Sequence, residues 1–237
     1  MKQKAVAHTR KDSRRPDTRS DVDILDCAID VDTSPIDRGG RSSHFVRVHT
    51  GSILCSPPRR KLQFAGRFRL YYADLDAAAA KGVSARDVLR ANANTVGYVC
   101  PLLRPQGDRF SPGLVDFLQL STLAANVLIL DRIGILPPFR GREVALIVTA
   151  ALIEQFGPGA AVAGMKPYPL QFEPGGHDVC TEWESELQLG SLLGSKQASV
   201  RMLRKYYERA GFARLPGSAF MFRNILDRPA RRFRLLQ

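Results

Sequence analysis

The spacing of apolar and polar residues changes sharply near residue 42. Residues 1–42 are polar and rich in Arg, Asp and Ser, and we expect a basic, mostly flexible extension there, with a possible short strand at residues 23–29. Apolar and polar positions then alternate with a period of two at residues 44–54, and more regularly at residues 62–72. This period is typical of half-buried strands, so the pattern predicts strands in both segments.

The middle of the chain carries shorter patterns. Helix-forming residues at 74–82 end in a glycine and predict a short turn of helix. Residues 84–94 predict a longer helix, because Ser84 is in the N-cap position and Asp87 is three residues later, where a capping box has its acid. Residues 111–118 fit either a short helix or a loop.

The clearest alternation of elements lies between residues 126 and 165. Residues 126–135 are nearly all apolar and predict a central strand, buried on both faces. Residues 142–156 predict an apolar helix, which Gly157-Pro158 ends. Residues 160–165 predict a second central strand. A strand, a helix and a strand in this order predict a crossover unit with parallel pairing.

Two further elements complete the pattern. Residues 195–211 predict a helix with Ser195 as N-cap and Gly211 as its stop, and residues 220–225 predict a last short strand. Together the patterns predict an α/β fold with a mixed central sheet flanked by helices. We expect one domain at residues 43–226, followed by a basic tail at residues 227–237.

Composition removes several classes of protein from consideration. No run of 18 apolar residues occurs, and the first residues lack the apolar core of a secretory signal. The four cysteines lie far apart without a CxxC spacing, which argues against a structural zinc site and a disulfide framework; they are Cys27, Cys55, Cys100 and Cys180. We therefore expect a cytoplasmic protein with no membrane partner and no metal. The sequence also lacks a hydrolase nucleophile elbow and a Walker-type loop.

The net charge of +12 suggests nucleic-acid binding, but its distribution weakens that interpretation. Residues 1–20 carry seven Lys or Arg and two Asp, a sum of +5, and residues 223–237 carry five Arg and one Asp, a sum of +4. The ends thus hold +9 of the +12. Nucleic acid remains a possible partner of the basic ends, although solvated tails are the simpler interpretation.

Candidate chemistry begins where the predicted strand at 126–135 leads into the helix at 142–156. The connection contains Pro137-Pro138 and then the segment 140–145, with the sequence Arg-Gly-Arg-Glu-Val-Ala. A helix start offers unpaired N–H groups and the positive end of the macrodipole, so two adjacent cations make this segment a candidate phosphate site. Glu143 adds a negative charge there, and it opposes an anion unless its side chain turns outward.

A second motif ends the helix at 195–211, where Tyr206-Tyr207-Glu-Arg-Ala precedes Gly211-Phe212. Val200, Leu203, Tyr207 and Ala210 share one helical stripe, which predicts that Tyr207 faces inward and Tyr206 lies to the side. A buried tyrosine is either a packed core residue or a proton donor.

These two motifs, in this order, resemble those of the GCN5-related N-acetyltransferases (GNAT family) over residues 60–226. The resemblance implies the GNAT fold, with a splayed sheet, and transfer of an acetyl group from acetyl-CoA to a primary amine. Glu143 departs from the family pattern, because it stands where the first glycine of Arg/Gln-x-x-Gly-x-Gly/Ala is usual. The residues that would bind acetyl-CoA are Ile133, Gly134, Ile135, Arg140, Gly141, Arg142, Glu143, Val144 and Ala145.

The same resemblance assigns the chemical roles. Tyr207 would protonate the departing thiolate, and Asp131 is one candidate for the base that accepts the amine's proton. Glu173 and Glu182 are other candidates for the base, and Asp131 is also a candidate for a structural ion pair. The acceptor is a small-molecule or protein amine. The rival hypothesis is a catalytically impaired binding module that acts on nucleic acid through the basic ends. The oligomeric state stays open.

Overall fold

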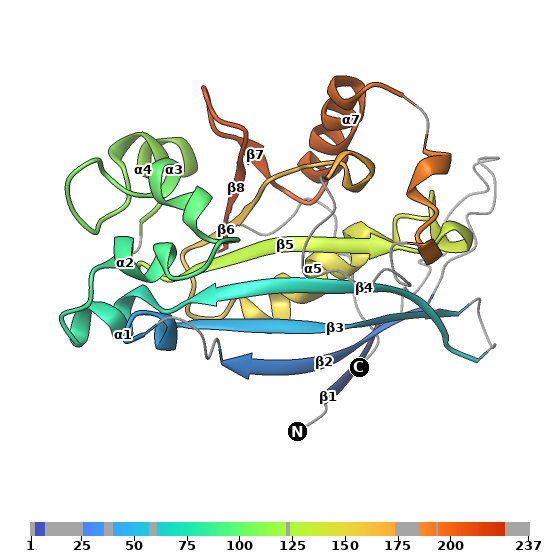
Figure 1. Cartoon of the computed structure of the whole chain (residues 1–237), viewed down its shortest axis with the longest axis horizontal. Helices are drawn as coiled ribbons and strands as arrows, with labels where there is room; N and C mark the ends of the chain where they lie inside the picture. Colours follow the sequence, from blue (N-terminus) through green and yellow to red (C-terminus); the bar gives the residue numbers. More distant parts are fainter. Residues whose placement is uncertain are drawn as a thin grey trace, which may run out of the picture.

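The computed structural model describes residues 3–7, 26–35, 40–56, 61–121, 124–173, 185–192 and 194–225. Its strands form one mixed sheet in the order β1-β2-β3-β4-β5-β6-β8-β7, in which β5 and β6 are parallel and the other neighbours antiparallel (Figure 1). The strands are β1 (Gln3–Ala7), β2 (Asp26–Pro35), β3 (Val46–Ser56), β4 (Gln63–Ala73), β5 (Val127–Ile135), β6 (Val162–Met165), β7 (Ala213–Arg214) and β8 (Met221–Asn224).

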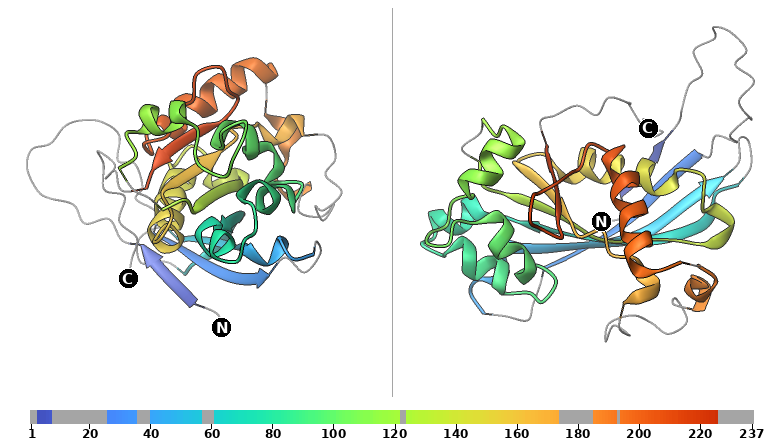
Figure 2. Two further views of the ribbon diagram at one scale, coloured as in Figure 1. Left: turned by 90° about the vertical axis from the view of Figure 1, so that its left-hand side faces the viewer. Right: turned by 90° about the horizontal axis from the view of Figure 1, so that it is seen from above.

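Helices cover both faces of this sheet. The α-helices are α1 (Leu75–Ala80), α2 (Ala85–Arg90), α3 (Val99–Leu102), α4 (Pro112–Leu118), α5 (Val144–Phe156) and α7 (Lys196–Glu208). The 3-10 helices are η1 (Ser43–Phe45), η2 (Val96–Tyr98), η3 (Pro137–Phe139), η4 (Leu170–Phe172) and η5 (Leu189–Ser191). The group α1–α4 lies near one end of the sheet, and α7 lies beside the other half of β5 (Figures 1 and 2). Among the described helices, none has the length and apolar character that a membrane span requires.

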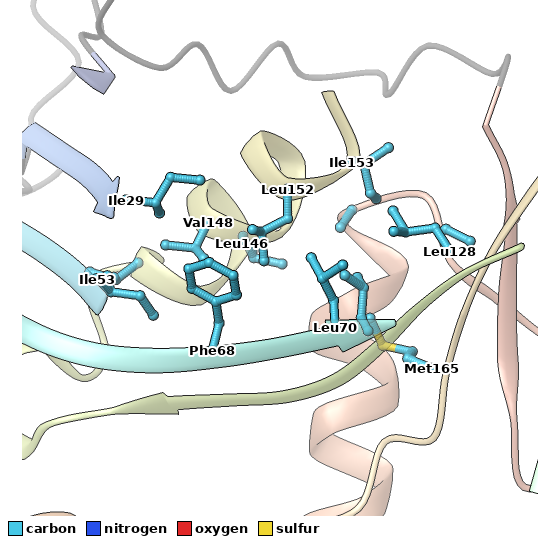
Figure 3. Packing of buried hydrophobic residues seen from close by; sticks show 14 of the residues in the cluster. Ile29, Ile53, Phe68, Leu70, Leu128, Leu146, Val148, Leu152, Ile153 and Met165 are labelled. Carbon is cyan, nitrogen blue, oxygen red and sulfur yellow. The ribbon is translucent and has the colours of Figure 1, made fainter. Parts of the chain in front are cut away.

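The strand β5 separates two hydrophobic clusters. Leu128 and Leu130 face the cluster beneath α5, whereas Val127 and Ile129 face the cluster beneath α1–α4. Figure 3 shows side chains of α5 directed toward those of the sheet, with Val148 close to Phe68. Burial on both faces explains why the sequence of β5 is a nearly continuous apolar run, and the prediction of a central strand is confirmed.

The predicted elements from residue 44 onward are present with bounds shifted by a few residues. The crossover β5–α5–β6 is parallel, as predicted. The ambiguous segment 111–118 is helical, because the Ser111 hydroxyl accepts a hydrogen bond from the Leu114 N–H and Pro112 starts α4. Ser195 caps α7 in the predicted way, accepting from the Ala198 N–H.

The predicted flexible extension needs a correction within the described part of the chain. The strand β2 pairs with β3 over ten residues, and its side chains Cys27, Ile29 and Val31 belong to the core cluster beneath α5. The short strand expected at residues 23–29 is therefore the longer strand β2, which begins three residues later and ends at Pro35. Composition misled the prediction, because Asp26, Asp30 and Asp32 lie among the core positions of β2. Residues 8–25 and the predicted tail 227–237 lie outside the described residues.

A buried histidine in β3 makes the stability of the fold depend on pH. His49 is 8% exposed, its Nδ1 is 2.8 Å from Thr33 Oγ1, and its ring packs against Phe156. Burial, and then the charge of Arg47, lower its pKa from 6.5 to about 4. The folded protein thus keeps His49 neutral at pH values where the unfolded chain binds a proton.

We expect the free energy of unfolding to decrease as pH falls from about 6.5 to about 4, by roughly 2–3 kcal/mol at most, since each pKa unit corresponds to about 1.4 kcal/mol. The measurement is urea unfolding across this pH range for the wild type and His49→Gln. The variant should lose this component of the slope, whereas His44→Gln, which alters an exposed histidine, should keep it. A slope that is the same in His49→Gln and the wild type would contradict the assignment.

Candidate functional site

The two parallel strands at the centre of the sheet separate after four residue pairs. The strand β6 pairs with Val127–Leu130 of β5, and within the described residues no strand pairs with Asp131–Ile135 on that edge. The separation follows from the sequence after β6, where Lys166 is followed by Pro167 and Pro169. Because proline has no N–H to donate, this segment cannot continue the ladder along β5.

The separation point coincides with a β-bulge. Arg69 pairs with Arg132 and Leu70 pairs with Leu130, which leaves Asp131 as the extra residue on β5. The Asp131 carboxylate accepts a hydrogen bond from Arg69 Nε at 2.6 Å, and both side chains are about four-fifths covered. Burial raises the pKa of Asp131 above its ordinary value, although the Arg69 charge opposes this shift. Asp131 therefore has both an ion pair and a pKa shifted toward that of a useful base.

A groove of about 720 Å³ occupies the space between the free edge of β5, the start of α5 and the α7 helix. Nine of the eleven predicted site residues line it: Asp131, Ile133, Ile135, Arg140, Gly141, Glu143, Val144, Ala145 and Tyr207. The other two do not line it, since Gly134 is buried opposite Arg67 of β4 and Arg142 is exposed. Residues far apart in the sequence therefore line one groove.

The residues at the start of α5 line this groove. Gly141 and Glu143 have positive φ angles of 73° and 59°, and Arg142 between them does not. Such an alternation turns successive N–H groups toward one point and forms a concave anion site, called a nest. Within the described chain, no group accepts a hydrogen bond from the N–H of Glu143, Val144 or Ala145. The helix start therefore has the local geometry that an oxyanion requires.

The conformation of Glu143 explains what a glycine would contribute at this position. A left-handed backbone is costly for a residue with a Cβ, and glycine adopts it freely. The Glu143 side chain makes no hydrogen bond to the N–H groups of the helix start and forms an ion pair with Arg209, the residue that follows α7. Arg209 therefore compensates the carboxylate charge of Glu143 next to the anion site. The sequence alone did not predict this pairing.

Arg140 is engaged by backbone carbonyls. Its Nε donates to the Ile135 carbonyl at 2.9 Å, and its Nη2 donates to the Leu187 carbonyl. Burial lowers the pKa of this guanidinium. Arg140 thus joins the end of β5 to the segment at residues 185–192, and Arg209 is the cation paired beside the start of α5.

Both tyrosines of the α7 motif line the groove, whereas only Tyr207 was predicted to face inward. Their rings meet edge to face, with centroids 5.3 Å apart. Burial raises the pKa of Tyr206 to about 12, against the effect of a backbone hydrogen bond from Leu146 at the start of α5. Burial also raises the pKa of Tyr207, and no described group hydrogen-bonds to its hydroxyl. Tyr207 thus keeps its proton and has a hydroxyl available to a ligand.

The other acids have different surroundings. Glu173 forms an ion pair with Arg132, beside the Arg69–Asp131 pair, and both residues line a smaller polar hollow of about 370 Å³ that adjoins the groove. Glu182 lies outside the described residues. Of the acids proposed as bases, Asp131 therefore lines the groove itself.

Arg209 and Tyr206 were missed by sequence reasoning. Tyr206 is adjacent to Tyr207, and the pairing of Arg209 with Glu143 joins residues 66 positions apart, so helical spacing gave no signal for it.

Among the described His, Cys, Asp and Glu side chains, no group of three is arranged to hold a metal ion. Comparison of this chain with protein-family models, with curated proteins and with solved structures finds no match.

Proposed function

We propose that this protein is an N-acetyltransferase of the GNAT type, which moves an acetyl group from acetyl-CoA to a primary amine. One observation carries the proposal: a single groove is lined both by the edge of β5 beyond its pairing with β6 and by the start of α5, whose first N–H groups donate to no described group. A ligand that suits it has amides at one end and a diphosphate at the other. Acetyl-CoA has this order of groups, with a thioester beyond the amides.

The ligand would lie along the groove in one direction. The pantetheine amides would pair with the edge of β5 that carries the backbone groups of Ile133 and the N–H of Ile135, as a third strand does; the Ile135 carbonyl is held by Arg140. The diphosphate would accept hydrogen bonds from the N–H groups of Glu143, Val144 and Ala145. The thioester would then lie near Asp131 and Tyr207, which both line the groove.

The chemistry in this arrangement is a direct transfer. The neutral amine nitrogen attacks the thioester carbonyl carbon, and the carbonyl oxygen gains negative charge that strand N–H groups stabilise. The C–S bond then breaks, and Tyr207 donates its proton to the thiolate sulfur. Asp131, directly or through a water molecule, accepts the proton that the amine nitrogen loses. The high pKa of Tyr207 favours the protonated form that this role requires.

The first test is binding of acetyl-CoA, with a matched pair of variants at Ala145. The side chain of Ala145 lines the groove in the first turn of α5. Ala145→Glu adds a negative charge that suits the helix start but repels a diphosphate, and Ala145→Gln adds the same bulk without charge. We expect Ala145→Glu to weaken acetyl-CoA binding at least about tenfold relative to Ala145→Gln, a difference of about 1.4 kcal/mol.

Thermal shift and calorimetry measure this difference. Ligand at about 100 times its dissociation constant should stabilise the wild type by roughly 2.7 kcal/mol and raise its melting temperature by several degrees. No binding at millimolar acetyl-CoA would contradict the proposal. The binding-module hypothesis would then come first, and steep salt dependence of nucleic-acid binding would support it.

A further inference from the structure

The ion pair between Glu143 and Arg209 lies where the proposed ligand would place its diphosphate. Glu143 precedes the first residue of α5, Arg209 follows the last residue of α7, and both residues line the groove. Their carboxylate and guanidinium are in direct contact, with 38% and 42% of the side chains exposed. The pair therefore joins the two helices across one end of the groove.

The ion pair between Glu143 and Arg209 resembles the contact that an arginine makes with a phosphate group of a ligand. A carboxylate and a phosphate both offer oxygen pairs that a guanidinium binds with parallel hydrogen bonds. Arg140 is engaged by two backbone carbonyls and Arg142 does not line the groove. Of these cations, Arg209 is therefore the one positioned to meet an anion at the α5 nest.

We propose that Arg209 is a diphosphate-binding residue of the groove, and that Glu143 occupies it until the ligand arrives. This inference rests on the proposed function for the identity of the ligand. Binding would exchange one partner of Arg209 for another: the Glu143 carboxylate leaves, and a phosphate oxygen takes its place. Exposed ion pairs contribute at most about 1 kcal/mol. Because the Glu143–Arg209 pair is half-exposed, breaking it costs the ligand little binding free energy.

The exchange predicts that Glu143 lowers affinity for ligands that carry phosphate and leaves others unaffected. The test variant is Glu143→Gln, which keeps the size of the side chain and the left-handed backbone but removes the charge. Glu208→Gln is the matched control, because it removes the same charge from the residue before Arg209. Arg209→Gln removes the proposed phosphate partner.

Three probes separate binding of the diphosphate from binding of the rest of the ligand. They are acetyl-CoA, S-acetylpantetheine, which has no phosphate, and inorganic pyrophosphate. Glu143→Gln should bind acetyl-CoA and pyrophosphate about 3- to 5-fold more tightly than the wild type, with S-acetylpantetheine within about twofold. Arg209→Gln should bind acetyl-CoA and pyrophosphate more weakly by a similar factor. Glu208→Gln should behave like the wild type with all three probes.

The outcomes separate this inference from the proposed function. If acetyl-CoA binds the wild type and Glu143→Gln equally well, the exchange is wrong and the acetyltransferase proposal is unaffected. If acetyl-CoA binds neither the wild type nor Glu143→Gln, but pyrophosphate binds Glu143→Gln more tightly than Arg209→Gln, the anion site is supported and the acetyltransferase proposal is wrong. If pyrophosphate does not distinguish these two variants, Arg209 has no part in anion binding.

Discussion

Tyr207→Phe is expected to lower turnover by about 100- to 10,000-fold while acetyl-CoA binding stays within about twofold of the wild type. This range is what a positioned general acid contributes. The substitution removes only the hydroxyl, for which the described chain provides no hydrogen-bond partner, so the fold loses no internal hydrogen bond. Loss of kcat without loss of affinity would place the hydroxyl in the transition state.

The matched control is Tyr206→Phe. This hydroxyl lies by the Leu146 backbone at the start of α5, away from the proposed thioester, so its removal should leave kcat within a few fold. Since burial raises the pKa of Tyr207, its protonated form persists through pH 10 and the rate should show no decline there from loss of this proton. Equal turnover of Tyr207→Phe and the wild type at all pH values would remove Tyr207 from the mechanism.

Gly66→Ala is expected to destabilise the fold by about 3 kcal/mol, a large effect for one methyl group. A Cβ at Gly66 would lie 2.1 Å from the carbonyl oxygen of Gly134 in β5. Because this neighbour is backbone and not a flexible side chain, β4 and β5 must separate at the position where Gly66 pairs with Ile135. The melting temperature should fall by roughly 6–12 °C.

Gly113→Ala serves as the control for this substitution. A Cβ at Gly113 meets no atom within 4 Å, and the residue is in α4, so alanine should change stability by no more than about 1 kcal/mol and in the stabilising direction. Calorimetric melting of both variants measures the contrast. Gly66→Ala should also weaken acetyl-CoA binding in the folded fraction, because the edge of β5 moves. Similar melting temperatures for both variants would contradict the clash.

The sequence was informative wherever one segment determined its own structure. The apolar run of β5, the cap at Ser195 and the stop at Gly211 each depend on neighbouring residues, and these elements were predicted. The candidate phosphate site was predicted for the same reason, because the strand, the turn and the start of α5 are consecutive.

Features that depend on distant partners were not visible. The bulge at Asp131 exists only relative to β4, and the pairing of Glu143 with Arg209 needs the packing of α7 near the start of α5. The strand β2 was assigned to a flexible extension because its acidic positions resemble those of a solvated tail. Its alternate positions, Cys27, Ile29 and Val31, carry the signal of burial, but β3 and α5 are needed to bury them.

The short parallel contact between β5 and β6 also has a mechanical consequence. Eight residue pairs join β4 to β5, whereas four join β5 to β6 and four join β6 to β8, so the described strands pair over shorter lengths from β6 onward. The strands β2 to β5 pair with one another over eight or more residues, so the four-pair contact between β5 and β6 can act as a hinge between them and the strands from β6 onward. A ligand that contacts both β5 and α7 would act as a brace across that hinge. Amide hydrogen exchange in Val162–Met165 would then slow when the groove is filled, even though those residues need not touch the ligand.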